Sequence, residues 1–164
     1  MKLVAKRAFP NATIVSDRFH VQKLMNEAIS DLRVDYRWQA IDQENEEIAF
    51  AKELGRRFMP HTFENGDTRR QLLARSRHIV MKHRSKWTES QRRRADILFR
   101  EYPAIEQAYE VSMKLTDIFN MRCNKGVALT KLARWYEEVE KLNSKFFNSV
   151  IQTMQNNYAT IANY

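Results

Sequence analysis

The sequence predicts a mainly α fold, a helical bundle that also contains a small β element near its beginning. Glycine and proline, which interrupt helices, occur only three times each among the 164 residues. From residue 88 onward, apolar residues recur at intervals of three and four, which places them on one face of successive helices. Residues 12–16 are apolar and rich in β-branched side chains, and they predict a buried strand.

A long helix is expected after this strand. The apolar residues from Phe19 onward repeat at helical spacing. They are Val21, Met25, Ala28, Leu32 and Tyr36. We expect the helix to continue to about Leu54, with Gly55 as its C-cap. Residues 56–67 contain Pro, Asn and Gly and are predicted to form a loop.

The segment after this loop has two open interpretations. Residues 78–82 (His-Ile-Val-Met-Lys) form a short apolar run that suits a strand. A helix through the same segment would place Arg70, Arg77 and Arg84 on one stripe, because they are seven residues apart. Periodicity alone does not choose between the two.

Four amphipathic helices are predicted beyond this segment. Residues 88–91 (Thr-Glu-Ser-Gln) match a capping box and predict a helix over about 89–102. Pro103 suits the first position of the next helix. Residues 124–126 (Asn-Lys-Gly) break that helix, and Ser144 is the predicted cap of the last one. Their apolar faces suffice for a small bundle.

Positive charge is concentrated in one segment, residues 69–94. The net charge of the whole chain is +8, whereas this segment holds ten basic residues and one acid, Glu89. The basic residues are Arg69, Arg70, Arg75, Arg77, Lys82, Arg84, Lys86, Arg92, Arg93 and Arg94. Such clustering indicates a polyanionic partner, most often DNA. The alternative is a solvated basic face without a ligand. Trp87 either stacks on an unpaired base or packs against the next helix.

Several classes of protein are excluded. No glycine-rich phosphate-binding motif is present, which excludes the common nucleotide-cofactor folds. A single cysteine excludes an internal disulfide framework and a cysteine-rich zinc site. No apolar run approaches about 18 residues, and the start of the chain does not resemble a secretory signal. We therefore expect a cytoplasmic protein without a membrane span.

Asp17 is the candidate catalytic residue. It stands at the carboxyl end of the predicted strand, where functional groups gather in open α/β sheets. His20 follows one helical turn later. A carboxylate there suits Mg²⁺, which prefers oxygen ligands, and two such ions can promote phosphoryl transfer. The alternative is that Asp17 caps the helix and His20 packs locally.

Several stretches resemble one family. Residues 9–21 read Phe-Pro-Asn-Ala-Thr-Ile-Val-Ser-Asp-Arg-Phe-His-Val, and residues 23–28 read Lys-Leu-Met-Asn-Glu-Ala. Both are similar to the central part of the DDE-type transposases of bacterial insertion sequences, specifically the L-three group. Segments 77–82, 88–91 and 102–110 also resemble this family. The likeness covers most of the chain.

The resemblance implies an RNase H-like core in which two Asp and one Glu hold divalent metal, Mg²⁺ or Mn²⁺, for strand cleavage and transfer. Asp17 matches the second Asp by position. The resemblance also favours residues 78–82 as the next parallel strand, which makes the β element a β-α-β remnant. It implies a partial catalytic core over 1–87 and a helical insertion domain over 88–164, with transposon-end DNA as the partner.

The sequence departs from the complete family pattern. The first Asp is expected upstream of Phe9 and the final Glu beyond Tyr164, so we expect a fragment of a transposase. One carboxylate cannot hold two metal ions in a defined geometry, so this polypeptide alone is predicted to be inactive. An exposed edge at residues 12–16 can recruit another chain, which predicts a homodimer.

Two other functions remain open from the residues. One is a stand-alone helical module that binds nucleic acid through residues 69–94. The other is a protein-interaction bundle whose basic segment docks an acidic partner. Phosphate binding through several cations is distinguished by its strong salt dependence.

Overall fold

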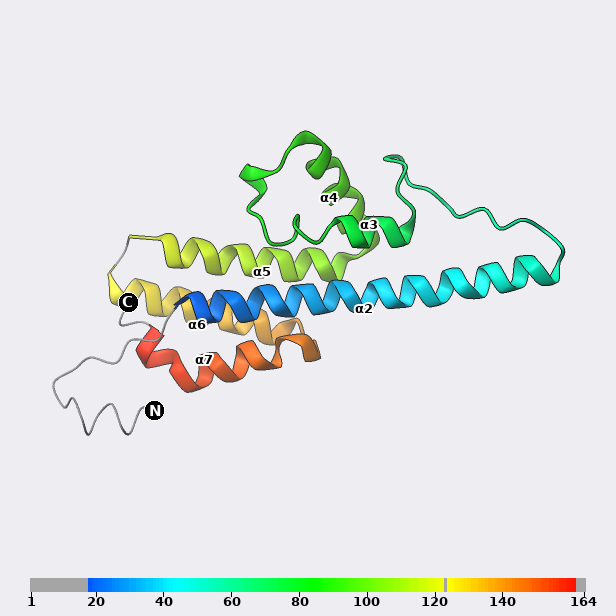
Figure 1. Ribbon diagram of the computed structural model, residues 1–164. Coiled ribbons are helices and arrows are strands. Elements are labelled where there is room, and N and C mark those ends of the chain that lie inside the picture. The colour runs from blue at the N-terminus through cyan, green and yellow to red at the C-terminus, as the bar shows by residue number, and fades with distance from the viewer. Residues whose placement is uncertain (1–17, 123, 162–164) are drawn as a thin grey trace. The chain divides into compact units, whose positions relative to one another are not determined.

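The computed structural model describes residues 18–122 and 124–161, and this part of the chain is mainly helical, as predicted (Figure 1). The helices are α2 (Arg18–Glu53), α3 (Arg69–Arg75), α4 (Glu89–Glu101), α5 (Pro103–Asn120), α6 (Lys125–Lys141) and α7 (Asn148–Ile161). Two short 3₁₀ helices, η1 (Arg84–Lys86) and η2 (Lys145–Phe147), precede α4 and α7. None of the described helices combines the length and apolar composition that crossing a bilayer requires.

Local chemistry in the sequence sets most helix ends. α2 ends where Gly55 adopts a left-handed φ of 63°. The N–H of Gly55 bonds to Lys52 O and that of Arg56 to Ala51 O, which is the Schellman arrangement. The predicted capping box of α4 is confirmed: Thr88 Oγ1 accepts from the Gln91 N–H, and Gln91 Oε1 accepts from the Thr88 N–H.

One other predicted boundary is confirmed, and two differ. Pro103 begins α5 as predicted. The break predicted at residues 124–126 lies earlier, because α5 ends at Asn120 and Lys125 and Gly126 belong to α6, which the Asn124 side chain caps by accepting from the Val127 N–H at 2.9 Å. Ser144 instead precedes the 3₁₀ turn η2 and makes no side-chain cap bond, and α7 begins at Asn148. The chain therefore completes a short turn before it enters the last helix.

The predicted β-α-β remnant is not found in the described part of the chain. Its first strand, residues 12–16, lies outside the described residues. The second, residues 78–82, is wrong, because residues 76–81 form turns. The N–H groups of Ile79 and Val80 bond back to Ser76 O, so local bonds replace a strand ladder while both side chains are buried. The alternative helix is also wrong, since α3 stops at Arg75 and residues 76–83 separate it from η1.

The chain divides into two compact units, one spanning Glu27–Glu110 and the other combining Met1–Asn26 with Val111–Tyr164. In the Glu27–Glu110 unit, α3, α4, the turns between them and parts of α2 and α5 bury an apolar core. It includes Ile29, Leu32, Leu72, Leu73, Ile79, Val80, Leu98, Phe99, Ile105 and Tyr109. The predicted division near residue 87 stays a prediction.

The second unit is held by packing around α6 and α7. Its buried side chains include Val21, Met25, Leu115, Leu132, Trp135, Val139, Phe147, Val150 and Met154. Trp135 is fixed further because its Nε1–H donates to Val111 O at 2.7 Å. An ion pair between Lys114 and Glu138, 2.7 Å apart, joins α5 to α6 at the surface.

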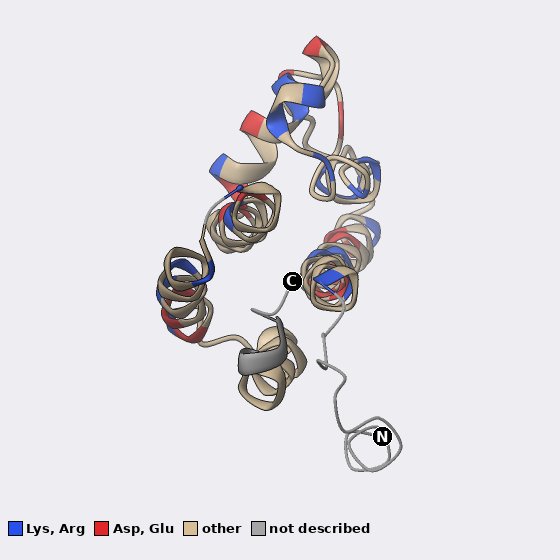
Figure 2. Ribbon diagram, turned by 90° about the vertical axis from the view of Figure 1, so that its left-hand side faces the viewer, with Lys and Arg blue, Asp and Glu red and all other residues tan. Residues whose placement is uncertain are grey.

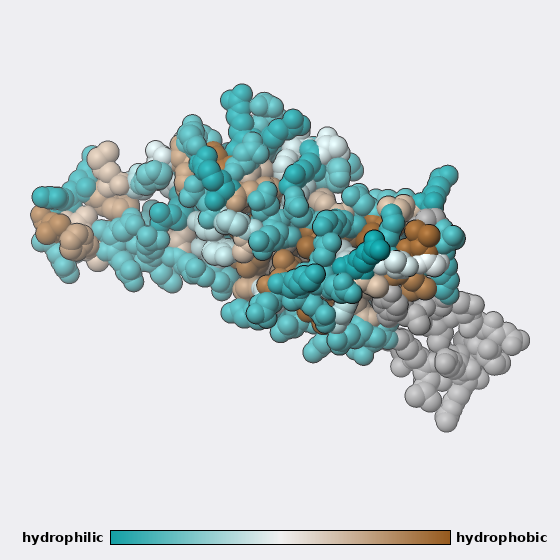
Figure 3. All heavy atoms as spheres, turned by 180° about the vertical axis from the view of Figure 1, so that it is seen from behind, coloured by the Kyte–Doolittle hydropathy of each residue, from teal (hydrophilic) through white to brown (hydrophobic). Residues whose placement is uncertain are grey.

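The distal half of α2 contrasts with the proximal half. Beyond Ala40, no residue of this helix is buried. Large apolar side chains are exposed here, and Figure 3 shows hydrophobic side chains at the end of the molecule where α2 meets the following loop. Phe50 is 63% exposed and Met59, in that loop, is 83% exposed.

Candidate nucleic-acid interface

The candidate metal residues are only partly visible. Asp17 lies outside the described residues. His20 is exposed in the first turn of α2. The described residues contain no group of three His, Cys, Asp or Glu side chains placed to hold a metal ion. By themselves they therefore do not fit the divalent metal that the resemblance implies.

The ten predicted DNA-binding residues all belong to the Glu27–Glu110 unit, but they come from different elements. Arg69, Arg70 and Arg75 lie on α3, Arg84 and Lys86 on η1, and Arg92, Arg93 and Arg94 on α4. Arg77 and Lys82 lie in the turns between α3 and η1. Figure 2 shows the Lys and Arg of these elements in blue; α3 and η1 contain no Asp or Glu, whereas α4 does. Their surroundings therefore decide which charges are available to a partner.

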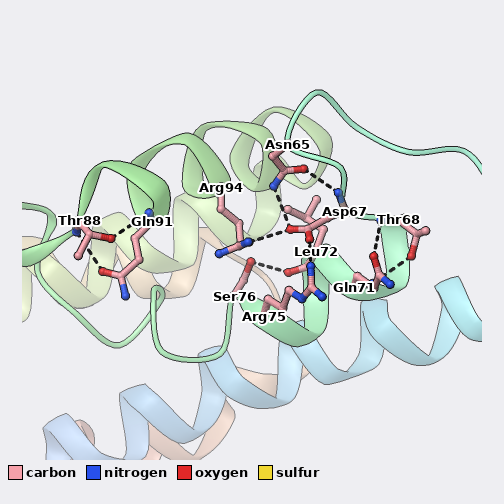
Figure 4. A network of polar contacts seen from close by, with 10 residues as sticks. All are labelled: Asn65, Asp67, Thr68, Gln71, Leu72, Arg75, Ser76, Thr88, Gln91 and Arg94. Carbon is pink, nitrogen blue, oxygen red and sulfur yellow. Dashed lines mark hydrogen bonds and ion pairs between the residues drawn. The ribbon is translucent and has the colours of Figure 1, made fainter.

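Asp67 engages two of these arginines (Figure 4). Its side chain is fully buried. Arg94 Nε donates to Asp67 Oδ2 at 2.7 Å, and Arg75 Nη1 donates to Oδ1. Asn65 donates to the same carboxylate and accepts from the Asp67 N–H. We name Asp67, Arg75 and Arg94 the Asp67 clamp; it ties the end of the 56–67 loop to α3 and α4.

The electrostatics of the Asp67 clamp favour the ionised carboxylate. Burial acts to raise the pKa of Asp67, but the hydrogen bonds and charges of Arg94 and Arg75 outweigh it, and the pKa is lowered below its usual value. The clamp also meets a helix start, because the next residue, Thr68, forms a capping box with Gln71 at the beginning of α3.

Four other cations have polar partners at the surface. Arg69 donates to Gln43 Oε1, and Arg70 pairs with Glu44 at 3.1 Å, so both contact α2. Arg93 pairs with Glu89 one turn earlier on α4. Arg84 pairs with Glu110 at 2.8 Å, and its guanidinium lies over the Tyr109 ring. Such exposed pairs are exchanged easily for a stronger anionic partner.

Of the ten predicted residues, three are exposed and have no acidic partner among the described residues: Arg77, Lys86 and Arg92. We call these three the exposed cation set. Lys82 is half-buried.

The connection that carries Arg77, Lys86 and their neighbours is fixed by two aromatic residues. Trp87 Nε1–H donates to Ile79 O at 3.1 Å, and Tyr109 Oη–H donates to Lys82 O at 3.0 Å. The two rings lie 5.4 Å apart. Trp87 is only 9% exposed, so it packs in the core rather than offering a face to an unpaired base. Burial also raises the pKa of Tyr109 to about 12, which keeps its hydroxyl protonated as a donor.

The sequence patterns do not reveal two important residues of this region. Asp67 lies in the loop predicted over residues 56–67, and the sequence predicts no function for its side chain. The signal available is the Asn-Gly-Asp sequence at 65–67, which is typical of a turn in which Asn and Asp side chains form local hydrogen bonds. Arg33 falls on a predicted helix without a role, yet it is 5% exposed and donates to Leu73 O at 2.7 Å. No sequence signal marks a buried arginine, because its burial depends on α3 packing across it.

Comparison with known proteins identifies the family. The model of the L-three group of DDE transposases, described as Transposase, matches residues 1–164. No curated protein and no solved structure matches the chain. The similarity seen in the sequence motifs is thus confirmed over the full length of the sequence, and the chain belongs to the DDE transposase family.

Proposed function

We propose that this transposase-family chain binds duplex DNA, in the transposon context the ends of the element, through cations of the Glu27–Glu110 unit. The observation that carries the proposal is the exposed cation set, Arg77, Lys86 and Arg92, which has no acidic partner in the described part of the chain. Cations that no carboxylate neutralises are available to phosphates, and counterion release then favours binding.

The proposed contacts are to the DNA backbone rather than to base edges. Lys and Arg on turns and on one helix face bind phosphates at any sequence, and such contacts position a protein on the duplex. The surface pairs of Arg70, Arg84 and Arg93 with carboxylates can open to add further contacts. Arg75 and Arg94 have a different assignment, because both are engaged by the buried Asp67.

The catalytic part of the proposal concerns Asp17. We assign it as the second acid of an RNase H-like core over residues 1–87, in which it would hold Mg²⁺ or Mn²⁺ together with other acids, and residues 88–164 as the helical insertion. Asp17 is the residue of this polypeptide that matches an acid of the family's triad. One carboxylate provides too few oxygen ligands for two metal ions, so residues 1–164 alone bind DNA without cutting it. A homodimer through residues 12–16 stays a prediction.

The binding proposal is tested by fluorescence anisotropy with a labelled duplex over a range of salt concentrations. The triple variant Arg77→Gln/Lys86→Gln/Arg92→Gln removes the exposed cation set. We expect weaker binding and a log–log salt slope that falls by about 0.9 for each phosphate that is no longer neutralised. The matched control Lys52→Gln/Arg56→Gln/Arg57→Gln changes three exposed cations outside residues 69–94 and lowers the net charge equally. Equal slopes for the two variants would refute the assignment and favour an acidic protein partner.

The inactivity proposal is tested with supercoiled plasmid and either Mg²⁺ or Mn²⁺. We expect no nicking by residues 1–164. Metal-dependent nicking that Asp17→Ala abolishes would overturn this part of the proposal and leave the DNA-binding part unaffected.

A further inference from the structure

Three arginines lie where α2 passes the C-terminal end of α3: Arg33 Nη1 donates to Leu73 O at 2.7 Å, four residues before Arg77 in the chain. Arg33 and Arg37 lie one turn apart on α2, and Arg77 follows α3 by two residues. Arg33 is close enough to both for their charges to act on it: burial lowers the pKa of Arg33 most, and the charges of Arg37 and then Arg77 lower it further. No carboxylate is among the groups that act on Arg33.

Arg33 is an unusual member of this group because it is buried. Its side chain makes one hydrogen bond, from Nη1 to Leu73 O at 2.7 Å, whereas its buried Nε has no partner within the described residues. A buried cation is normally paired and fully hydrogen-bonded, because desolvation is expensive. Two further cations nearby increase the repulsion.

A purely structural role explains only part of this arrangement. Leu73 lies in the last turn of α3, where the carbonyl groups carry partial negative charge, so one bond from Arg33 is favourable there. That bond accounts for one N–H group of a guanidinium that has five. It does not account for the unpaired Nε or for the approach of Arg37 and Arg77, both of which are exposed and have no acidic partner among the described residues.

We propose that Arg33, Arg37 and Arg77 form a phosphate-binding site that takes a backbone phosphate when the chain binds DNA. Arginine suits this ligand because its planar fork donates two parallel hydrogen bonds to phosphate oxygens. The site extends the interface from residues 69–94 onto α2, which no sequence signal indicated. The identity of the phosphate as part of DNA rests on the proposed function; free inorganic phosphate offers the same chemistry.

The first arm of the test uses inorganic phosphate alone. Thermal unfolding of the full chain is followed at constant ionic strength while phosphate replaces chloride. We expect Tm to rise with phosphate concentration, because an anion that binds only the folded state stabilises it. Arg33→Met and Arg37→Gln should abolish the phosphate-dependent rise, whereas Arg57→Gln, an exposed cation elsewhere in the same unit, should keep it.

Arg37→Gln separates this role from helix capping. Arg33→Met removes the bond to Leu73 O as well as the site, so it should also lower stability in chloride, whereas Arg37→Gln keeps that bond and should lose only the response to phosphate. A chain that gains nothing from phosphate over chloride, or an Arg37→Gln variant that keeps the full rise, would overturn the site.

The second arm identifies the source of the phosphate. In the duplex titration, Arg37→Gln should lower the log–log salt slope by about one, while Arg57→Gln leaves it unchanged. An Arg37→Gln variant that loses the rise of Tm with inorganic phosphate but keeps the wild-type salt slope for duplex binding would overturn the assignment to DNA and show a free-phosphate site. If the wild-type chain binds no duplex, the proposed function is wrong, and the unfolding experiment with inorganic phosphate still shows whether Arg33, Arg37 and Arg77 form a phosphate-binding site.

Discussion

The Asp67 clamp and the exposed cation set contain the same kind of residue in opposite surroundings. Arg75 and Arg94 pair with the fully buried carboxylate of Asp67. Arg77 lies two residues after Arg75 and Arg92 two residues before Arg94, yet both are exposed and have no acidic partner in the described part of the chain. Both groups belong to the same basic stretch of the sequence, so charge density does not distinguish them. They differ in whether their positive charge is paired with a carboxylate or is available to a partner.

The difference follows from what each group must neutralise. A buried carboxylate has lost its hydration, so it requires cations and hydrogen-bond donors close by. An exposed guanidinium is already hydrated and needs no protein partner. The clamp arginines therefore contribute to folding energetics, whereas we propose that the exposed cation set contributes to DNA binding. Variants that separate stability from DNA affinity can break or sharpen this division.

The largest expected effect separates two neighbouring residues of α4. Arg94→Gln leaves the buried Asp67 with Arg75 as its only cation, and we expect a loss of about 3 kcal/mol in the free energy of unfolding. Arg93→Gln removes an exposed pair with Glu89, and its effect should stay within about 0.5 kcal/mol. Urea unfolding of both variants measures the contrast. Equal losses would show that Asp67 is not the clamp's centre.

The pH dependence of stability tests the same clamp. The pKa of Asp67 is lowered in the folded state, so its stabilising contribution is fully present above the unfolded value of about 3.9 and is lost as pH falls through the folded pKa. We expect the stability difference between the wild type and Asp67→Asn to be constant near neutrality and to shrink below about pH 4. Urea unfolding from pH 7 to pH 3 measures it. A difference that grows on acidification would contradict the sign.

Local sequence patterns predicted the helices well. The boundaries of α2, α4 and α5 follow from a glycine C-cap, a capping box and an N-terminal proline, which act through neighbouring backbone groups. The prediction of a strand over residues 78–82 is wrong because a short apolar run is compatible with any buried segment, not only with a strand. Ile79 and Val80 are buried in a turn, since Trp87 and Tyr109 bond the carbonyls of Ile79 and Lys82.

The candidate site was predictable as a segment and not as a set of contacts. Composition located the basic stretch, but the division between Arg94 and Arg92 depends on Asp67, which lies 27 residues before Arg94. The burial of Arg33 likewise depends on α3, whose Leu73 lies 40 residues further along the chain. Such pairings are tertiary, and no local pattern encodes them.

A smaller effect is expected in the connection that supports the exposed cation set. Tyr109→Phe removes the donor to Lys82 O but keeps the ring, so we expect a loss of about 1 kcal/mol. Trp87→Phe removes the donor to Ile79 O and part of a buried ring, and it should be more destabilising. Thermal unfolding measures both. Full stability of Trp87→Phe would show that the aromatic pair does not fix the connection.

The smallest expected effect on stability is at Arg92, and it completes the contrast with Arg94 on the same helix. Arg92 is exposed and has no acidic partner among the described residues, so Arg92→Gln should change the free energy of unfolding by less than about 0.5 kcal/mol. The same variant should lower the salt slope of duplex binding by about 0.9, because it neutralises one phosphate fewer. Arg94→Gln, measured at a temperature where it remains folded, should change stability and leave the slope close to that of the wild type. If instead Arg94→Gln lowers the slope as much as Arg92→Gln does, a guanidinium paired with Asp67 still reaches phosphate, and burial of its partner is then no guide to which arginines bind DNA.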